Sequence, residues 1–223
     1  MNNLHETILI ASDLHLTTNF IEKKYRYLKK LFLSVDKIII NGDFWTAYYN
    51  TFDEFLETKW NKLFPILLSK KAIYLYGNHD KEKWQDSRNK LFSVWQGDEY
   101  KFEADGVKYK IAHGHTYLGD SISTESFMKT WRFFKFDVIK YFIESLLLRT
   151  IGVFIYKPAA LMNNKVKEYS KEIRDIDYLI IGHTHWGDID KSSKFINSGI
   201  IHSGISNYIL IKNGNPKFIR EKY

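Results

Sequence analysis

The feature that most constrains how this chain folds is a run of three isoleucines at positions 38–40. Consecutive β-branched residues closed by Asn41 and Gly42 are typical of a strand buried on both faces, and such a strand requires a sheet covered by helices. Asp43 follows directly, beyond the carboxyl end of the strand, where open α/β sheets place their functional groups. The run therefore predicts an α/β fold with a carboxylate at a chemically important edge.

Four further strand-like runs end in the same way, each on side chains that bind metals. The polar residues that follow them are Asp13 and His15 after 7–11, Asn78, His79 and Asp80 after 71–76, His113 and His115 after 108–112, and His183 and His185 after 178–181. Carboxylate, imidazole and amide groups are ligands for divalent cations. We therefore expect these side chains to converge, with Asp43 in the middle as a bridge between two ions.

Composition limits the chemistry that is available to such a site. A chain of 223 residues suffices for one full domain, or for one domain with an insertion. There are no cysteines, which excludes disulfides and thiolate metal sites, so that a metal must be held by histidine, carboxylate and amide ligands. The first twelve residues show no basic segment followed by an apolar one, and the cytoplasm is the predicted compartment.

Charge and helical periodicity single out one segment. The formal net charge is +7, and residues 121–174 contain ten Lys and Arg against five Asp and Glu. This excess predicts an acidic partner, for which phosphates, nucleic acid and an anionic membrane face are all candidates. The same segment has an apolar stripe at helical spacing, made of Phe127, Trp131, Phe134, Val138, Phe142 and Leu146.

The order of elements predicts parallel strands joined by right-handed crossovers. We expect helices over 19–33, 52–68 and 81–95, a hairpin of 100–103 with 107–112, and closing strands over 194–197, 208–212 and 217–220. Residues 1–120 and 177–223 are predicted to form the core, and residues 121–176 a cap of two or three inserted helices.

The five motifs, in this order, resemble those of the calcineurin-like metallophosphoesterase superfamily. The resemblance covers most of the chain outside the predicted cap, and it implies a four-layer αββα sandwich with two metal ions at its centre. Carried over onto this sequence, it implies that Asp43 bridges both ions and that the other ligands form two groups. The first is Asp13, His15 and His185, and the second is Asn78, His113 and His183.

The resemblance also implies a reaction. Two cations clamp the oxygens of an in-line displacement and lower the pKa of a bound water, which produces a nucleophile near neutral pH. This ligand set accepts Mn²⁺, Fe or Zn²⁺, and manganese is the cation we expect first. His79 is expected to face the substrate and to protonate the leaving oxygen, while Asp80 orients its ring.

The predicted cap resembles the lid of the UDP-2,3-diacylglucosamine pyrophosphatases. That resemblance implies a lipid-nucleotide substrate, peripheral contact with the inner face of a membrane, and contacts from Asn164, Lys165 and Lys167 to the diphosphate or nucleotide. The chain departs from that subfamily at three positions. It has His79 where the subfamily usually has arginine, His115 where it has aspartate, and Thr46 where it has an acidic residue, which leaves the substrate open.

Two other functions fit the same residues. A nuclease or nucleotide phosphodiesterase would use the basic segment to bind phosphates. A non-catalytic scaffold on the same fold would use the apolar surface for a partner protein. Nucleic-acid binding favours a charged groove with separated aromatic residues, whereas residues 151–156 form an apolar block. His202 is equally consistent with a position at the site and with ordinary packing.

Overall fold

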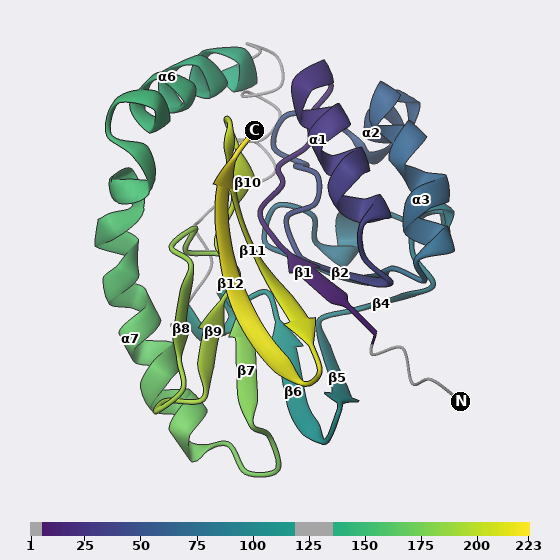
Figure 1. Ribbon diagram of the computed structural model, residues 1–223. Helices are drawn as coiled ribbons and strands as arrows, with labels where there is room; N and C mark the ends of the chain where they lie inside the picture. The colour runs from purple at the N-terminus through teal and green to yellow at the C-terminus, as the bar shows by residue number, and fades with distance from the viewer. Residues whose placement is uncertain (1–5, 119–135) are drawn as a thin grey trace.

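A computed structural model describes residues 6–118 and 136–223, and it contains two β-sheets flanked by helices (Figure 1). The strands of one sheet are β1 (Ile8–Ala11), β2 (Lys37–Asn41), β3 (Ile73–Leu75), β4 (Trp95–Gly97), β10 (Ile201–His202), β11 (Ile205–Lys212) and β12 (Asn215–Lys222). The strands of the other are β5 (Glu99–Ala104), β6 (Val107–Ala112), β7 (Tyr178–Ile181), β8 (Asp188–Asp190) and β9 (Phe195–Asn197).

The helical elements are α1 (Glu22–Leu33), α2 (Phe52–Glu57), η1 (Lys59–Leu63), α3 (Phe64–Ser69), η2 (Glu82–Trp84), η3 (Ser87–Leu91), α4 (His115–Leu118), α6 (Phe136–Thr150), η4 (Gly152–Tyr156) and α7 (Lys157–Glu172), where η marks a 3₁₀ helix. They include α1 to α3 on the outer side of the first sheet and α7 on the outer side of the second.

The strand order places parallel strands at the centre of each sheet. In the first sheet the order is β10-β11-β1-β2-β3-β4, with β12 also paired to β11, and β1 to β4 are parallel. In the second the order is β5-β6-β7-β9-β8, and β6, β7 and β9 are parallel. The predicted parallel pairing is thus confirmed, and the carboxyl ends of the parallel strands carry the five motifs.

Alternating side chains of the central strands divide the interior into layers. Leu9 and Ile38 pack into a cluster with the side chains of α1 to α3. Ile10 and Ile39 point the other way and pack against Ile180 and its neighbours on the second sheet. Because each central strand is apolar on both faces, it holds a helical layer on one side and a sheet on the other. This is the predicted αββα sandwich.

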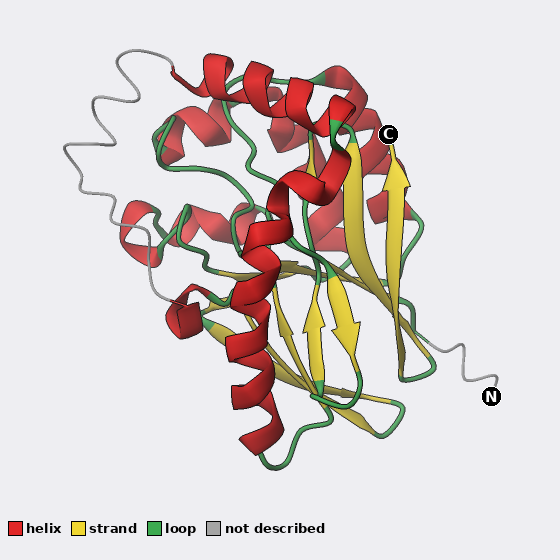
Figure 2. Ribbon diagram, turned by 90° about the vertical axis from the view of Figure 1, so that its left-hand side faces the viewer, coloured by secondary structure: helices red, strands yellow, loops and turns green. Residues whose placement is uncertain are grey.

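Helix α7 forms the outer layer over the second sheet. Its Val166 packs with Leu179 and Phe195, and the Ser170 hydroxyl donates to the carbonyl oxygen of Ser193 at 2.5 Å. Figure 2 shows α7 running along this sheet, with α6 bent away at its upper end. The prediction assigned 121–176 to a cap, and within this segment α7 packs on the second sheet. The first part of the predicted cap, with Phe127, Trp131 and Phe134, lies outside the described residues.

Two predicted helices are shorter in the structure. The segment 52–68 is divided into α2, η1 and α3 because Thr58 takes an extended backbone, with ψ 160°. The segment 81–95 contains only η2 and η3 before β4, since the Asp86 side chain accepts a hydrogen bond from the Arg88 N–H and starts a new turn. The predicted hairpin is present and turns at Asp105 and Gly106, both with positive φ.

No single helix in the described parts of the chain has the length and apolar character needed to cross a membrane. Residues Phe142–Leu148 and Gly152–Glu172 meet these criteria only as a pair, and the two arms are bent by 114° at the break between them.

Candidate metal centre

The first predicted group of ligands comes together from both sheets. Asp13 follows β1, and His185 follows β7 on the other sheet; their atoms Oδ1 and Nε2 are 3.3 Å apart. The Nε2 atom of His15 lies 3.3 Å from the Nε2 atom of His185 and 3.9 Å from Asp13 Oδ1. Asp13 is fully buried, whereas the two imidazoles are partly exposed. Three donor atoms thus face one point at the boundary between the sheets.

The second predicted group lies beside the first. The Asn78 Oδ1 atom is 3.2 Å from His113 Nε2 and 2.8 Å from His183 Nδ1. The other ring nitrogen of His113 is 2.7 Å from the carbonyl oxygen of Asn41, and this contact fixes the orientation of the ring. Such a contact leaves Nε2 as the nitrogen that is directed at the centre.

Asp43 stands between the two groups. Its Oδ2 atom is 3.3 Å from His113 Nε2 and 3.8 Å from His15 Nε2, so that one oxygen faces one imidazole of each group. Its Oδ1 atom accepts a hydrogen bond of 2.8 Å from the backbone N–H of His79. One carboxylate oxygen is therefore held by the backbone, and the other is directed between the two groups.

Glycines make this convergence possible at two strand ends. A β-carbon on Gly77, just past β3, would collide with the carboxylate of Asp43. A β-carbon on Gly182, just past β7, would lie 2.7 Å from Asp13 Oδ2. Only a residue without a side chain lets the two carboxylates approach the neighbouring strand ends this closely.

The electrostatics of the cluster fit bound cations. Asp13 Oδ1 is buried and accepts no hydrogen bond from the described residues, which is expensive unless a positive charge faces it. Burial would raise the pKa of Asp43, but His113, His79 and His15 hold it well below its usual range. Burial and the neighbouring His113 lower the pKa of His183 to about 4, which keeps that imidazole neutral and able to bind a metal.

His79 lies at the open side of the centre. The side chain is 15% exposed, its Nε2 atom is 4.0 Å from Asp43 Oδ2, and its ring meets the ring of His15 edge-on with centroids 4.6 Å apart. The Thr46 hydroxyl is 3.0 Å from His79 Nδ1, and the ring of Tyr48 lies against the imidazole at 4.1 Å. His79 is thus oriented by neighbours from the loop after β2.

Asp80 has a different role from the predicted one. Its Oδ1 atom accepts hydrogen bonds from the backbone N–H groups of Gly77 at 2.7 Å and Asp43 at 3.0 Å, and its Oδ2 atom accepts from Phe44 at 2.8 Å. The carboxylate therefore joins the loops after β2 and β3, and Thr46 takes the place beside the His79 ring that was predicted for Asp80. Burial and the nearby Asp43 raise the pKa of Asp80 to about 7.

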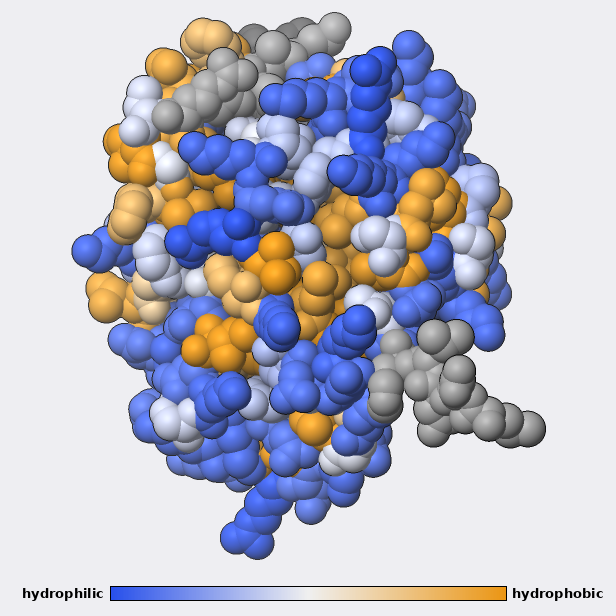
Figure 3. All heavy atoms as spheres, viewed as in Figure 1, coloured by the Kyte–Doolittle hydropathy of each residue, from blue (hydrophilic) through white to orange (hydrophobic). Residues whose placement is uncertain are grey.

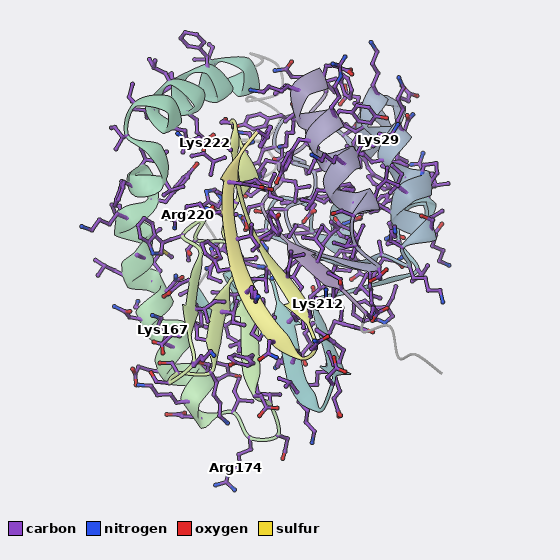
Figure 4. The ribbon with its side chains drawn as sticks, viewed as in Figure 1. Lys29, Lys167, Arg174, Lys212, Arg220 and Lys222 are labelled. Atoms are coloured by element: carbon purple, nitrogen blue, oxygen red, sulfur yellow. The ribbon has the colours of Figure 1, made fainter. Side chains whose placement is uncertain are left out.

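The predicted substrate contacts on α7 are arranged differently. Asn164 and Lys165 are exposed, and the Lys167 ammonium forms ion pairs with Asp188 at 2.7 Å and Asp190 at 3.3 Å (Figure 4). Asn163 is the residue that faces the loop after β7, where its Oδ1 atom accepts a 2.9 Å hydrogen bond from the Thr184 hydroxyl. Contact of Asn164, Lys165 and Lys167 with a substrate stays a prediction.

Sequence reasoning also missed two residues near the centre, Lys24 and Glu144, and left the place of His202 open. Lys24 is buried and lies four residues before Leu28, on the apolar stripe of α1. This position on the apolar stripe could have indicated from the sequence that Lys24 is buried. Glu144 has its carboxylate oxygen Oε2 3.4 Å from His202 Nε2, and the His202 ring lies 6.1 Å from that of His15. Residues 144 and 202 are too far apart in sequence for any local pattern to have paired them.

A two-sheet sandwich with nitrogen and oxygen donors gathered at its strand ends defines a class of metal-dependent phosphoesterase. Residues 6–187 match the model of the calcineurin-like phosphoesterase family, and the chain belongs to that family. The clustered donors of this family member could hold divalent cations. No curated protein matches the sequence significantly.

Several solved structures are similar to this chain. An archaeal phosphodiesterase is 18% identical, with a TM-score of 0.48 and coverage of 96% of this chain and 99% of that one. The phosphoesterase Yfce from E. coli is 15% identical, with a TM-score of 0.47 and coverage of 92% and 87%. Vps29 from Entamoeba histolytica in complex with zinc is 13% identical, with a TM-score of 0.46 and coverage of 97% and 98%.

Proposed function

We propose that the protein is a dinuclear metal-dependent hydrolase of phosphoester or pyrophosphate bonds, with manganese as the preferred cation. The observation that carries this proposal is the position of Asp43, whose Oδ2 atom faces His15 of one ligand group and His113 of the other. One cation would be held by Asp13, His15 and His185. The other would be held by Asn78, His113 and His183, and Asp43 would bind both cations. A scaffold protein would not require this complete donor set.

The residues around the cations would have different roles in the reaction. Two bound cations supply Lewis acidity and a water of lowered pKa. His79, held by Thr46 and Tyr48 at the partly exposed side, is in place to hold a proton for the leaving oxygen. Asp80 accepts hydrogen bonds from the backbone amides of Asp43 and Gly77 and so holds their two loops at a fixed separation. This fixes the position of the bridging Asp43 carboxylate.

The exposed apolar face of α6, η4 and the start of α7 supports a lipid-linked substrate. Its members are Ile139, Phe142, Ile143, Leu146, Leu147, Ile151, Phe154, Leu161 and Met162, each 36 to 71% exposed. Figure 3 shows hydrophobic residues gathered at the upper left edge of the molecule, where α6 and α7 lie. A face of this kind favours a lipid surface over nucleic acid, which binds charged grooves with separated aromatic rings. We propose that the protein is cytoplasmic and contacts the inner face of a membrane peripherally.

Hydrolysis of two substrates tests this proposal. Wild type, Asp43→Ala and His79→Ala, each loaded with Mn²⁺, are assayed on UDP-2,3-diacylglucosamine and on bis(p-nitrophenyl) phosphate. We expect wild type to prefer the lipid, Asp43→Ala to lose metal and activity together, and His79→Ala to keep its metal with kcat reduced by about 10² to 10⁴. Glu168→Ala, an exposed change on α7, is the control.

The results separate the parts of the proposal. If wild type hydrolyses only the aryl diester, the metal site is correct and the lipid substrate is wrong. If metal-loaded wild type hydrolyses neither compound, the hydrolase assignment fails. If His79→Ala is as active as wild type, the leaving oxygen receives its proton from another group.

A further inference from the structure

A small cavity lies directly beside the metal centre, between α1 and α6. The metal ligands His15 and His185 line one side of it, and Lys24, Glu144 and His202 line another. Its volume is about 40 Å³. Since a water needs about 10–15 Å³ of such space, the cavity holds about three water-sized groups. A substituent on a phosphate bound at the metals would enter this cavity first.

Lys24 contributes a buried amine whose hydrogen-bond donors the described part of the fold does not fully use, and which is an ammonium below its pKa of about 7. The residue is only 2% exposed, and its ammonium donates to the carbonyl oxygen of Leu14. An ammonium has three N–H donors, and Leu14 is the one hydrogen-bond acceptor for them among the described residues. Burying a lysine in this way is unfavourable by several kcal/mol unless another group binds the remaining donors. The cavity is the space into which such a group fits.

Glu144 contributes an acceptor on the opposite helix. Its carboxylate accepts a hydrogen bond from the Tyr156 hydroxyl, and its Oε2 atom is 3.4 Å from His202 Nε2. The side chain is 16% exposed. Its charge interacts with that of Lys24, so the cavity presents an ammonium and a carboxylate together.

This pairing selects the chemistry of the occupant. A lysine ammonium only donates hydrogen bonds and an ionised carboxylate only accepts them, so an occupant that satisfies both must accept and donate. A hydroxyl group does both, and neighbouring hydroxyls reach both side chains at once. A second phosphate fits less well, because the Glu144 carboxylate offsets the positive charge of Lys24 and would repel the phosphate. The aromatic side chains Tyr49 and Trp60 complete the wall.

We propose that Lys24 and Glu144 bind hydroxyl groups of the substituent esterified to the scissile phosphate, so that the preferred substituent on that phosphate is a small polyol such as glycerol. This inference rests on the proposed phosphoester hydrolysis and narrows its substrate class. The two side chains are specificity-determining residues, and they act at a distance from the proton transfer assigned to His79.

A matched pair of esters tests the inference. Glyceryl p-nitrophenyl phosphate and propyl p-nitrophenyl phosphate differ only in two hydroxyl groups. For wild type loaded with Mn²⁺ we expect kcat/KM to be about tenfold higher for the glyceryl ester, as for hydrogen bonds to charged groups. Lys24→Met and Glu144→Gln should each bring the ratio of the two kcat/KM values to about one. Lys29→Met and Glu168→Gln, which are exposed, should keep the wild-type ratio.

Binding gives a second measurement without turnover. Glycerol 1-phosphate should bind wild type about tenfold more tightly than propyl phosphate in calorimetric titration, and the two cavity variants should lose this difference. Should Lys24→Met fail to fold, Glu144→Gln decides the question alone. If wild type treats both esters equally, or if a folded cavity variant keeps the preference, this inference is overturned while the proposed function stands. If wild type cleaves neither ester but cleaves UDP-2,3-diacylglucosamine or bis(p-nitrophenyl) phosphate, this inference alone is overturned; if it cleaves none of the four compounds, both are overturned.

Discussion

Five of the predicted metal ligands have a backbone conformation that side chains other than glycine rarely adopt. The φ angles of Asp13, His15, Asp43, His183 and His185 lie between 46° and 67°. Each such residue is less stable than in a regular conformation by about 1–3 kcal/mol. Sharp reversals of this kind turn the side chains at consecutive strand ends toward one point. The strain persists because buried strands on both sides of the loops fix their positions.

At the residue scale, the Thr46 hydroxyl is expected to position His79. The replacement Thr46→Val keeps the shape of the side chain but removes the hydroxyl that lies 3.0 Å from His79 Nδ1. Because the ring then loses its fixed orientation, we expect kcat to fall about tenfold, with unchanged metal content. Thr46→Ser, which retains the hydroxyl, should restore most of kcat in the same assay. Equal kcat values for the valine and serine variants would contradict this role.

Lys24 is expected to make stability depend on pH. Burial lowers its pKa to about 7, against the opposing effect of Glu144, from about 10.4 in an unfolded chain. Between these values the unfolded state binds more protons, so the free energy of unfolding rises with pH. Lys24→Met lacks this titrating group. The slope of its free energy of unfolding against pH should therefore be smaller than that of wild type by about 1.4 kcal/mol per pH unit.

Urea unfolding of chelated protein at several pH values between 7 and 10 measures this slope. Lys29 is an exposed lysine on the same helix (Figure 4), and Lys29→Met should keep the wild-type slope. Identical slopes for wild type and Lys24→Met would show that Lys24 does not titrate in this range.

At the element scale, helix α6 has two faces with different expected roles. Glu144 points inward to His202, whereas Phe142 and Leu146 are 69% and 54% exposed. If the exposed face contacts lipid, the double change Phe142→Glu and Leu146→Glu should weaken binding to phosphatidylglycerol vesicles by about tenfold or more, because charges replace buried apolar area. Leu33→Glu, at an exposed position on α1, is the control in the same flotation assay. Vesicle binding that is unaffected by the double change would contradict a role for α6.

At the scale of the whole molecule, the candidate metal centre lies between the two sheets and draws its ligands from both. Asp13 and Asp43 come from the first sheet, and His113 and His183 come from the second. Bound cations should therefore stabilise the sandwich as a unit. With metal at about 100 times its Kd the gain is about 2.7 kcal/mol, and chelation should lower Tm by about 5–10 °C.

Asp43→Asn, which removes the bridging carboxylate charge, should make Tm insensitive to the chelator. Thermal unfolding of both proteins with Mn²⁺ and with EDTA measures this difference. A wild-type Tm that does not respond to chelation would contradict metal binding between the sheets.

Local patterns in the sequence were sufficient for the sheet core and for the donor set. The apolar runs at 38–40 and 178–181 form central strands, because an uninterrupted β-branched run is stable only when both faces are covered. The parallel order follows from the alternation of strands and helices. The types of donor residue beyond the strand ends were likewise readable from the sequence, since strand ends of one direction share one edge.

Tertiary structure decided which side chains meet. It directed Asn163 rather than Asn164 toward the centre, put Thr46 beside His79, and packed α7 onto the second sheet. It also brought Lys24 of α1 to the same cavity as Glu144 of α6. Sequence periodicity fixes which residues share the face of one element, but the rotation and contacts of two elements depend on how all their side chains pack together. For this reason the sequence determined the types of donor residue at the candidate metal centre, and only the packed fold determined the cavity beside it.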